Sequence, residues 1–261
     1  MKNSTKTLLG AAGLVGLFAC NAYADDAPAA PAPDWVLTGT LDVQSDYKFR
    51  GISQNERDPS PQGALTLSGP DGFYVSSWAS TINWQLDGVD GNPGVEWDIY
   101  GGKHTDLWGT DLNVEAYYYA YPDAETFGGS KASYFEAITQ LTHAFGPLSV
   151  QATWAWSPEF SLGGGTGNWL AGNATYTVLD WLTVSGNVGH QWVQAAKYFG
   201  SSDYTEWDLG ATATWKMFSL DLRYIDTDLS KGSCANFYMP TKDACEGNFV
   251  ATLNYNFTLW P

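Results

Sequence analysis

The sequence predicts an all-β protein: an antiparallel, up-and-down transmembrane β-barrel of about 12 strands in a bacterial outer membrane. Three observations support this prediction. Apolar and polar residues alternate with period two along most of the chain, short connections alternate with long ones, and the first residues have the pattern of an export signal. A soluble β-sandwich is the competing fold, but it gives no reason for such regular alternation of connection lengths.

Residues 1–24 have the pattern of a secretory signal peptide. Two lysines provide the basic start, residues 8–19 form an uncharged apolar run, and residues 22–24 (AYA) match a cleavage site. The apolar run is too short for a membrane helix, which needs about 20 residues. A lipoprotein signal is the alternative, because Cys20 follows a small residue. Residues 25–34 (DDAPAAPAPD) are expected to form a Pro/Ala-rich periplasmic linker.

The composition narrows the classes of partner. Lys+Arg number 12 and Asp+Glu 28, for a net charge of -16, and loss of two lysines with the signal gives -16 − 2 = -18. Nucleic acid is excluded as an expected partner, because phosphate binding needs a basic surface. The chain also has 13 Trp, 15 Tyr and 12 Phe, yet its mean hydropathy is only -0.23. Strands that alternate apolar and polar residues explain this combination.

Alternation from residue 35 onward predicts the barrel domain, residues 35–261. In the first segment Trp35 and Leu41 share one face, while Thr38 and Thr40 share the other. By this criterion the strands lie near residues 35–46, 61–69, 72–82, 95–105, 111–121, 133–145, 147–157, 169–178, 181–191, 204–216, 218–226 and 249–259.

The connections between these strands predict the orientation of the barrel. Barrels of this class have short periplasmic turns and long external loops. Short connections are expected at residues 70–71, 106–110, 146, 179–180 and 217, and long ones at 47–60, 83–94, 122–132, 158–168, 192–203 and 227–248. The last strand is amphipathic and is followed by Trp260, which predicts recognition by the barrel-assembly machinery. Pro261 after that aromatic departs from the usual ending.

Charged residues on the inward face are the candidate pore-lining residues. Strand parity selects Asp42, Asp46, Lys48, Arg50, Asp98, Glu115, Glu136, Asp208, Asp221 and Arg223. If the first strand continues past Ser45, the two cations in SDYKFRGISQ (residues 45–54) point into the lumen at the external mouth. Tyr47 and Phe49 then join the outward aromatic girdle. The two cations either tune the pore or neutralise nearby acids and hold the first loop.

SDYKFRGISQ also resembles a family signature. TorF-type porins carry an S-D-Y-x-F-R-G-x-S-Q run, and every fixed position of it is matched within residues 45–54. The similarity extends to a Gly- and Trp-rich body and to a cysteine pair before the last strand. The resemblance implies a barrel and suggests a porin, and it supplies no substrate.

Cys234 and Cys245 are expected to form a disulfide. They are the two cysteines left after removal of residues 1–24, and two close cysteines in an oxidising compartment pair readily. The loop 227–248 that holds them is a candidate constriction of the pore or an external cap.

No residue is predicted to be catalytic, and no metal or cofactor is expected. An outer-membrane hydrolase is the less favoured alternative: His190 with Ser201 or Ser202 is its best candidate pair, but no motif marks a base, an orienting group and an oxyanion hole together. Residues 87–92 (DGVDGN) resemble a calcium loop without its final glutamate. Residues 163–167 (GGGTG) lack the context of a phosphate loop and are expected to form a flexible external loop.

The expected function is passive diffusion of small polar solutes or ions, with a preference for cations, because acids lining a confined passage concentrate counter-ions. The alternative is a non-conducting structural or interaction barrel. Large inward aromatics would favour it by filling the lumen, and Tyr100, Tyr117 and Tyr119 are the candidates. Membrane lipid and lipopolysaccharide are the expected surroundings of the outward face.

Overall fold

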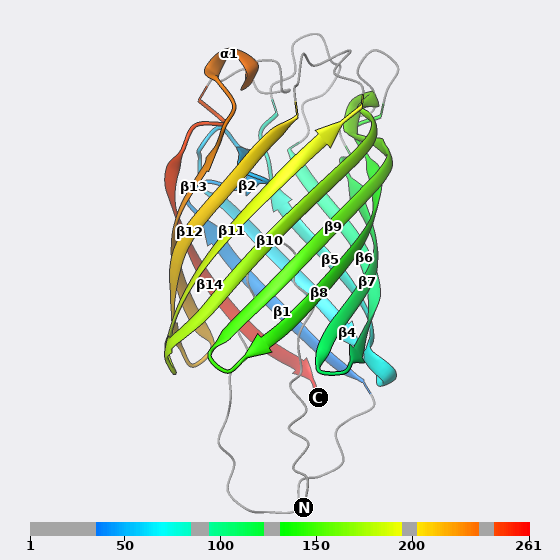
Figure 1. Ribbon diagram of the computed structural model, residues 1–261, viewed down its shortest axis with the longest axis vertical. Helices are drawn as coiled ribbons and strands as arrows, with labels where there is room; N and C mark the ends of the chain where they lie inside the picture. Colours follow the sequence, from blue (N-terminus) through cyan, green and yellow to red (C-terminus); the bar gives the residue numbers. More distant parts are fainter. Residues whose placement is uncertain (1–34, 85–93, 123–130, 195–202, 235–242) are drawn as a thin grey trace, which may run out of the picture.

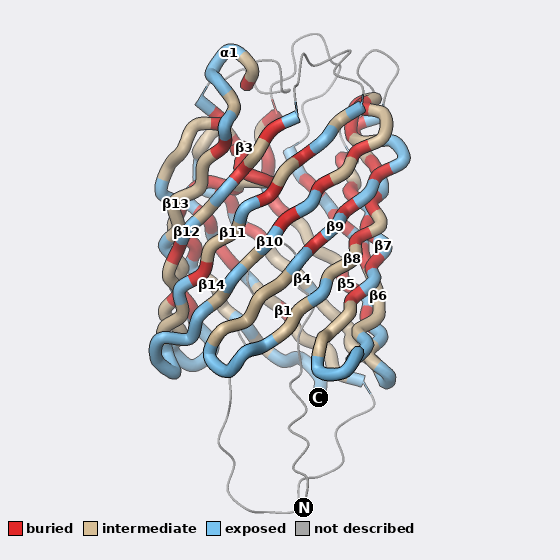
Figure 2. Tube along the Cα trace, in the orientation of Figure 1, coloured by how far each residue is buried: buried red, intermediate tan, exposed pale blue. Residues whose placement is uncertain are grey.

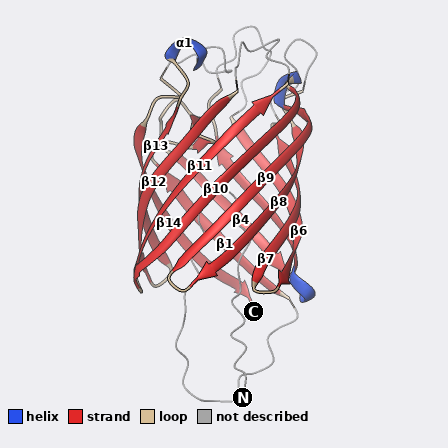
Figure 3. Ribbon diagram, viewed as in Figure 1, coloured by secondary structure: helices blue, strands red, loops and turns tan. Residues whose placement is uncertain are grey.

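The computed structural model describes residues 35–84, 94–122, 131–194, 203–234 and 243–261. Within these residues twelve antiparallel strands close into one barrel (Figures 1 and 3). The barrel strands are β1 (Val36–Gln44), β4 (Ser60–Ser68), β5 (Phe73–Thr81), β6 (Val95–Leu107), β7 (Thr110–Ala120), β8 (Tyr134–Phe145), β9 (Leu148–Phe160), β10 (Gly165–Leu179), β11 (Leu182–Val193), β12 (Tyr204–Trp215), β13 (Phe218–Thr227) and β14 (Asn248–Trp260). The predicted fold class is confirmed.

Each barrel strand pairs with its neighbours in the chain, and β1 closes the sheet by pairing with both β4 and β14. Because successive residues of a strand face opposite sides, the predicted alternation becomes a division between surface and lumen. Leu41 and Val43 of β1 are exposed on the outside, while Asp42 and Gln44 are buried inside. No helix in the described part of the chain is long and apolar enough to cross a membrane.

Tight turns join the strands at the end of the barrel where the described chain begins and ends (Figure 1). Trp108 and Gly109 both have positive φ, of 55° and 86°, the conformation of a two-residue hairpin whose twist matches the strands. A short 3-10 turn, η1 (Pro70–Gly72), joins β4 to β5. The predicted short turns are therefore confirmed at this end.

The connection predicted at 158–168 is shorter than expected. β9 continues to Phe160 and β10 begins at Gly165, with only the 3-10 turn η2 (Ser161–Gly163) near their junction. The cause is local packing, because Leu162 is almost completely buried and its backbone N–H donates to the Lys131 carbonyl. The GGGTG segment is therefore largely part of a turn and a strand, which corrects the prediction of a loop.

The first strand differs most from its prediction. β1 ends at Gln44, and the chain then bends into a separate two-stranded hairpin, β2 (Lys48–Phe49) and β3 (Ile52–Ser53). Tyr47 and Phe49 therefore do not join an outward girdle, and that prediction is wrong. Tyr47 is only 8% exposed and its ring contacts the ring of Trp78, with centroids 5.5 Å apart.

Four predictions fall on residues outside the described ranges. These are the signal peptide (1–24), the Pro/Ala linker (25–34), the calcium-like segment (87–92), and the serine partners of His190 at positions 201 and 202.

A glycine pair tests how closely β6 approaches its neighbours. A Cβ at Gly102 would lie 2.5 Å from the Val114 carbonyl oxygen, whereas a Cβ at Gly172 would meet nothing within 4 Å. We expect Gly102→Ala to cost about 1–3 kcal/mol of unfolding free energy, because backbone must shift to admit the methyl group. Gly172→Ala is the control and should be neutral or slightly stabilising. The unfolding free energy of each variant is measured by urea unfolding, with the gel shift of the unheated folded barrel as the readout. Equal stability of the two variants would contradict the close packing of Gly102 against Val114.

Candidate channel lumen

The SDYKFRGISQ segment folds into the lumen as a hairpin. Lys48 pairs with Ser53 and Phe49 with Ile52, and the two turn residues Arg50 and Gly51 have φ of 46° and 84°. Positive φ at both central positions is the preferred geometry of a two-residue hairpin, and glycine adopts it without strain. A Cβ on Gly51 would lie 2.5 Å from Cγ2 of Thr227. The tip of the hairpin therefore touches the barrel wall at β13.

Arg50 joins this hairpin to the barrel wall. Its guanidinium donates to both carboxyl oxygens of Glu136 on β8, at 3.0 and 2.6 Å, and to Oε1 of Gln191 on β11 at 2.6 Å. Its Cζ lies 4.7 Å from the ring centroids of Phe49 and Trp169. Arg50 is 4% exposed, and the Tyr204 hydroxyl donates to its carbonyl at 3.1 Å. A buried bidentate ion pair of this kind fixes both the position and the orientation of the guanidinium.

The base of the hairpin is held by Asp46. Its Oδ1 accepts from the Ser53 hydroxyl at 2.6 Å, and its Oδ2 accepts from the Asn248 amide at 2.9 Å. The Tyr47 backbone N–H donates to Asn55 Oδ1 at 3.1 Å. Asp46 is 1% exposed. These bonds tie the segment after β1 to the hairpin and to β14.

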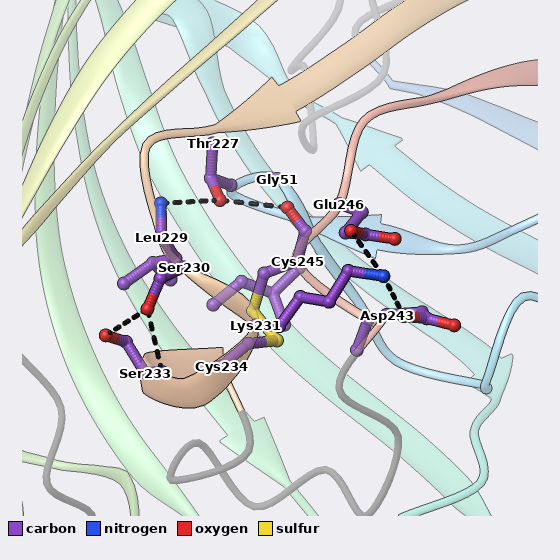
Figure 4. Close-up of a disulfide and its surroundings, with 12 residues drawn as sticks. Gly51, Thr227, Leu229, Ser230, Lys231, Ser233, Cys234, Asp243, Cys245 and Glu246 are labelled. Carbon is purple, nitrogen blue, oxygen red and sulfur yellow. Dashed lines mark hydrogen bonds and ion pairs between the residues drawn. A yellow bond between two sulfur atoms is a disulfide. The ribbon is translucent and has the colours of Figure 1, made fainter.

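The disulfide-closed loop covers the outer side of the hairpin. Cys234, the last residue of α1 (Lys231–Cys234), is bonded to Cys245, which confirms the predicted disulfide. Figure 4 shows Lys231 reaching across to Asp243 and Glu246, with N–O distances of 3.0 and 2.8 Å. α1 lies at the loop end of the barrel (Figure 1). Of the two predicted roles for loop 227–248, its described residues fit the external cap.

Carbonyls of this loop accept hydrogen bonds from the hairpin. The Ser53 N–H donates to Ala244 O at 2.9 Å, and Lys48 Nζ donates to Glu246 O at 2.9 Å and Ala244 O at 3.4 Å. Arg57, which follows the hairpin, donates to Glu246 O at 3.1 Å. The hairpin is thus held between the barrel wall, through Arg50, and the outer loop.

A ladder of aromatic rings fills the lumen beside the hairpin. Tyr100 stacks on Tyr117 at 4.5 Å, Tyr117 lies 4.3 Å from Tyr119, and Tyr119 stacks on Tyr134 at 4.4 Å between ring centroids. Phe49 of the hairpin contacts the edge of Tyr119 at 5.7 Å. Figure 2 shows the buried residues concentrated toward the loop end of the barrel. The three inward tyrosines that the sequence singled out therefore do occupy the passage.

Predicted pore-lining residues fall into two groups on the barrel strands, the separate residue Asp42, and three residues at the hairpin. Asp98, Glu115 and Glu136 are at most 4% exposed and accept from tyrosine hydroxyls: Tyr117 to Asp98 at 2.8 Å, Tyr74 to Glu115, and Tyr119 to Glu136 at 3.1 Å. Asp208, Asp221 and Arg223 form a second cluster, with Arg223 bridging both acids. Asp42 is buried on β1, while Asp46, Lys48 and Arg50 belong to the hairpin and not to a barrel strand.

The half of the lumen nearer the tight turns is lined largely by uncharged polar side chains, together with the inward pair His104 and Asp111. The uncharged ones are only half-buried, so water reaches them, and they include Thr40, Thr66, Gln140, Thr142, Gln151, Asn173, Thr175 and Asn254. The described lumen is therefore open to water at the turn end and narrowed at the loop end.

Four lumen residues were not among the sequence candidates. Glu96 and Glu206 are 1% and 2% exposed, and Gln191 and Trp169 contact Arg50. Strand parity already placed Glu96 beside Asp98 and Glu206 beside Asp208, so those two signals were present. No sequence pattern indicated the contacts of Gln191 and Trp169 with Arg50, because these contacts depend on the position of the hairpin tip in the folded barrel.

The three histidines lie on three different strands, β6, β8 and β11. His104 faces inward and its Nδ1 lies 2.8 Å from Asp111 Oδ2. His143 Nδ1 lies 2.9 Å from the Thr110 hydroxyl, and His190 Nδ1 lies 2.9 Å from the Thr205 hydroxyl. No described group of three His, Cys, Asp or Glu residues has the arrangement of a metal site.

Comparison with known proteins places the chain in a family. The model of the Gcw_chp family, described as bacterial proteins of unknown function, matches residues 28–257, so the chain belongs to this family. The TorF-type resemblance remains a prediction. No curated protein matches the sequence.

Solved structures with a similar fold are outer-membrane channels. KdgM porin in complex with disordered oligogalacturonate has a TM-score of 0.56 and 9% identity over 85% of this chain and 98% of that one. The COG4313 outer membrane channel from Pseudomonas putida F1 has a TM-score of 0.51 and 12% identity over 91% of this chain and 100% of that one. At such identities the similarity establishes a porin-like barrel fold.

The Arg50 ion pair yields a stability prediction. Arg50→Ala leaves the Glu136 carboxylate buried and unpaired, so we expect a loss of about 3–5 kcal/mol. Arg57→Ala removes a cation from the same segment but leaves no buried acid unpaired, and should cost only about 1 kcal/mol. Urea unfolding gives the free energies. Trypsin cleavage after Lys48 in the folded barrel reports release of the hairpin, and similar behaviour of the two variants would argue against Arg50 as the anchor.

The burial of Lys48 predicts that the unfolding free energy depends on pH. Burial lowers the pKa of its ammonium to about 8, against about 10.4 in an unfolded chain. Between these values the unfolded state binds more protons, so unfolding free energy should rise with pH, by up to roughly 3 kcal/mol. Lys48→Met should flatten this rise while leaving the rest of the pH profile unchanged. An identical profile in Lys48→Met would show that this amine does not titrate there.

Proposed function

We propose that this member of the Gcw_chp family is an outer-membrane channel for passive diffusion of small polar solutes or ions, with a preference for cations. We also propose that it is of the TorF type whose signature residues 45–54 resemble, and that it reaches the outer membrane through an export signal. The observation that supports it most is a closed barrel whose narrowed lumen carries more acids than bases.

The charge inventory of the lumen favours cations. Its buried acids are Asp42, Asp46, Glu96, Asp98, Glu115, Glu136 and Glu206, against the buried side chains of Arg50 and Lys48. Acidic groups within low-dielectric walls raise the local concentration of cations and repel anions. The similar KdgM porin was solved with oligogalacturonate, a polyanion. The acidic lumen of the present chain is electrostatically unsuited to such a ligand.

The width of the passage favours small solutes. A barrel of about 12 strands lies between filled small barrels and open porins of about 16–18 strands. Here the hairpin and the tyrosine ladder occupy part of that limited cross-section. The lumen is therefore suited to ions and compact polar molecules.

The filled loop end also supports a second candidate, the non-conducting barrel. Arg50 binds residues of β8 and β11, and Tyr119 contacts both the hairpin and Tyr134. Such contacts make the lumen a packed core, as in small barrels. In this case the charged residues would serve stability, and the outer loops would bind a partner or lipopolysaccharide.

Planar-bilayer recording under a KCl gradient separates these two candidates. The channel predicts discrete current steps with a cation-selective reversal potential in the wild-type protein, and larger steps in Arg50→Ala, because release of the hairpin widens the outer end. Folded wild-type protein that stays silent while Arg50→Ala conducts would identify a plugged barrel. Silence of both folded proteins would support the structural role.

The Arg223 cluster tests the origin of the selectivity. Arg223 with Asp208 and Asp221 forms a partly exposed group of two acids and one base. Arg223→Gln makes this group more negative and should increase the permeability ratio of K⁺ to Cl⁻, whereas Asp221→Asn makes it neutral and should decrease it. Shifts of equal sign in the two variants would mean that the local charge does not set selectivity.

A further inference from the structure

A small aromatic cavity lies beside the hairpin in the described lumen. Its rings come from Phe49, Trp84, Tyr121, Tyr134, Phe160 and Tyr204. The rings support one another: Trp84 lies 4.4 Å from Tyr121, and Tyr134 lies 4.9 Å from Phe160, between ring centroids. The volume is about 50 Å³, room for only a few water-sized groups. A ligand of this cavity is therefore compact.

The polar side chains that line the cavity are already engaged. Gln54 donates to Ile52 O at 2.9 Å and accepts from the Trp84 indole at 3.0 Å. Gln191 accepts from Arg50 and donates to Asn168 O and Trp192 O, both at 3.1 Å. Ser161 donates to Ala132 O at 2.8 Å. A sugar needs several free hydrogen-bonding partners on burial and would find few here.

A carboxyl group behind the rings favours a cation over an anion. The Tyr121 hydroxyl donates to Glu96 Oε1 at 3.1 Å, which increases the electron density of its ring. Glu96 and Asp98 have no ion pair among the described residues, and one oxygen of each is buried without a hydrogen-bond partner. The nearby cation Arg50 is matched by Glu136. An approaching cation therefore meets a cluster of aromatic rings, one of which is hydrogen-bonded to a carboxyl group that has no ion pair.

From these observations we infer that the cavity binds a compact alkylated ammonium ion, of the quaternary ammonium class, held by its aromatic rings. Such a cation needs no hydrogen bonds, and aromatic faces attract it through their negative quadrupole. The surrounding rings also make van der Waals contact with the methyl groups of the cation. This site adds a class of solute to the proposed channel function. Binding of the cation does not depend on that function, whereas its passage to the periplasm does.

Binding is measured by calorimetry on the folded mature protein in detergent, with excess KCl. The probes are tetramethylammonium, choline, the neutral carbon isostere of choline, and glucose. We expect both cations to bind and the isostere to bind at least about tenfold more weakly, since it lacks the charge that the rings attract. Equal binding of choline and its isostere, binding of glucose alone, or no binding by folded protein would each overturn the proposal.

Variants locate the site. Trp84→Leu should weaken tetramethylammonium binding by about tenfold, while Trp84→Phe, which keeps a ring, should retain most of it. Tyr100→Leu is the control, because Tyr100 belongs to the tyrosine ladder but does not line the cavity. Equal loss in Trp84→Leu and Tyr100→Leu would place binding elsewhere. If a variant does not fold, the comparison of choline with its isostere on wild-type protein still decides. Failure here leaves the bilayer currents, and hence the channel proposal, unaffected.

Discussion

Closure of the sheet is the constraint on which the rest of the structure depends. In a hydrocarbon environment an unpaired strand edge would leave its backbone N–H and C=O groups without partners, at a cost of several kcal/mol for each group. The pairing of β1 with both β4 and β14 removes those edges. Closure also encloses a lumen, which must be occupied either by side chains or by water. The charged and aromatic residues of the lumen are arranged within that limit.

The barrel meets this limit differently at its two ends. Near the tight turns, threonine, asparagine and glutamine remain in contact with water. Near the loops, the hairpin carries a cation into the lumen, where Glu136 and Gln191 receive it. A single side chain thereby links the segment after β1 to strands on other parts of the wall. The disulfide-closed loop holds the same hairpin from outside through its backbone carbonyls.

The imbalance between acids and bases in the lumen connects this architecture to the proposed channel. Arg50 compensates Glu136, and Arg223 compensates one of its two acids. The remaining acids include Glu96 and Asp98, which are each 1% exposed and have no ion pair among the described residues. Glu96 lies behind the aromatic cavity, where it accepts a hydrogen bond from Tyr121. The proposed ion preference and the proposed class of solute therefore share one physical basis, the carboxyl groups of the lumen.

The sequence by itself determined the barrel, because period-two alternation and connection lengths are local properties of the chain. Successive side chains of a strand point to opposite faces, so the alternation directly separates the outer surface from the lumen. It placed the twelve strands, the tight turns and the disulfide, and strand parity put Asp98, Glu115 and Glu136 inside. It misplaced Tyr47 and Phe49, although the Arg50-Gly51 pair with its glycine is a turn signal that a hairpin uses. Only the tertiary structure decided that this hairpin turns inward and meets Gln191 and Trp169. Those contacts join residues more than a hundred positions apart, and no local pattern encodes a partner at that distance.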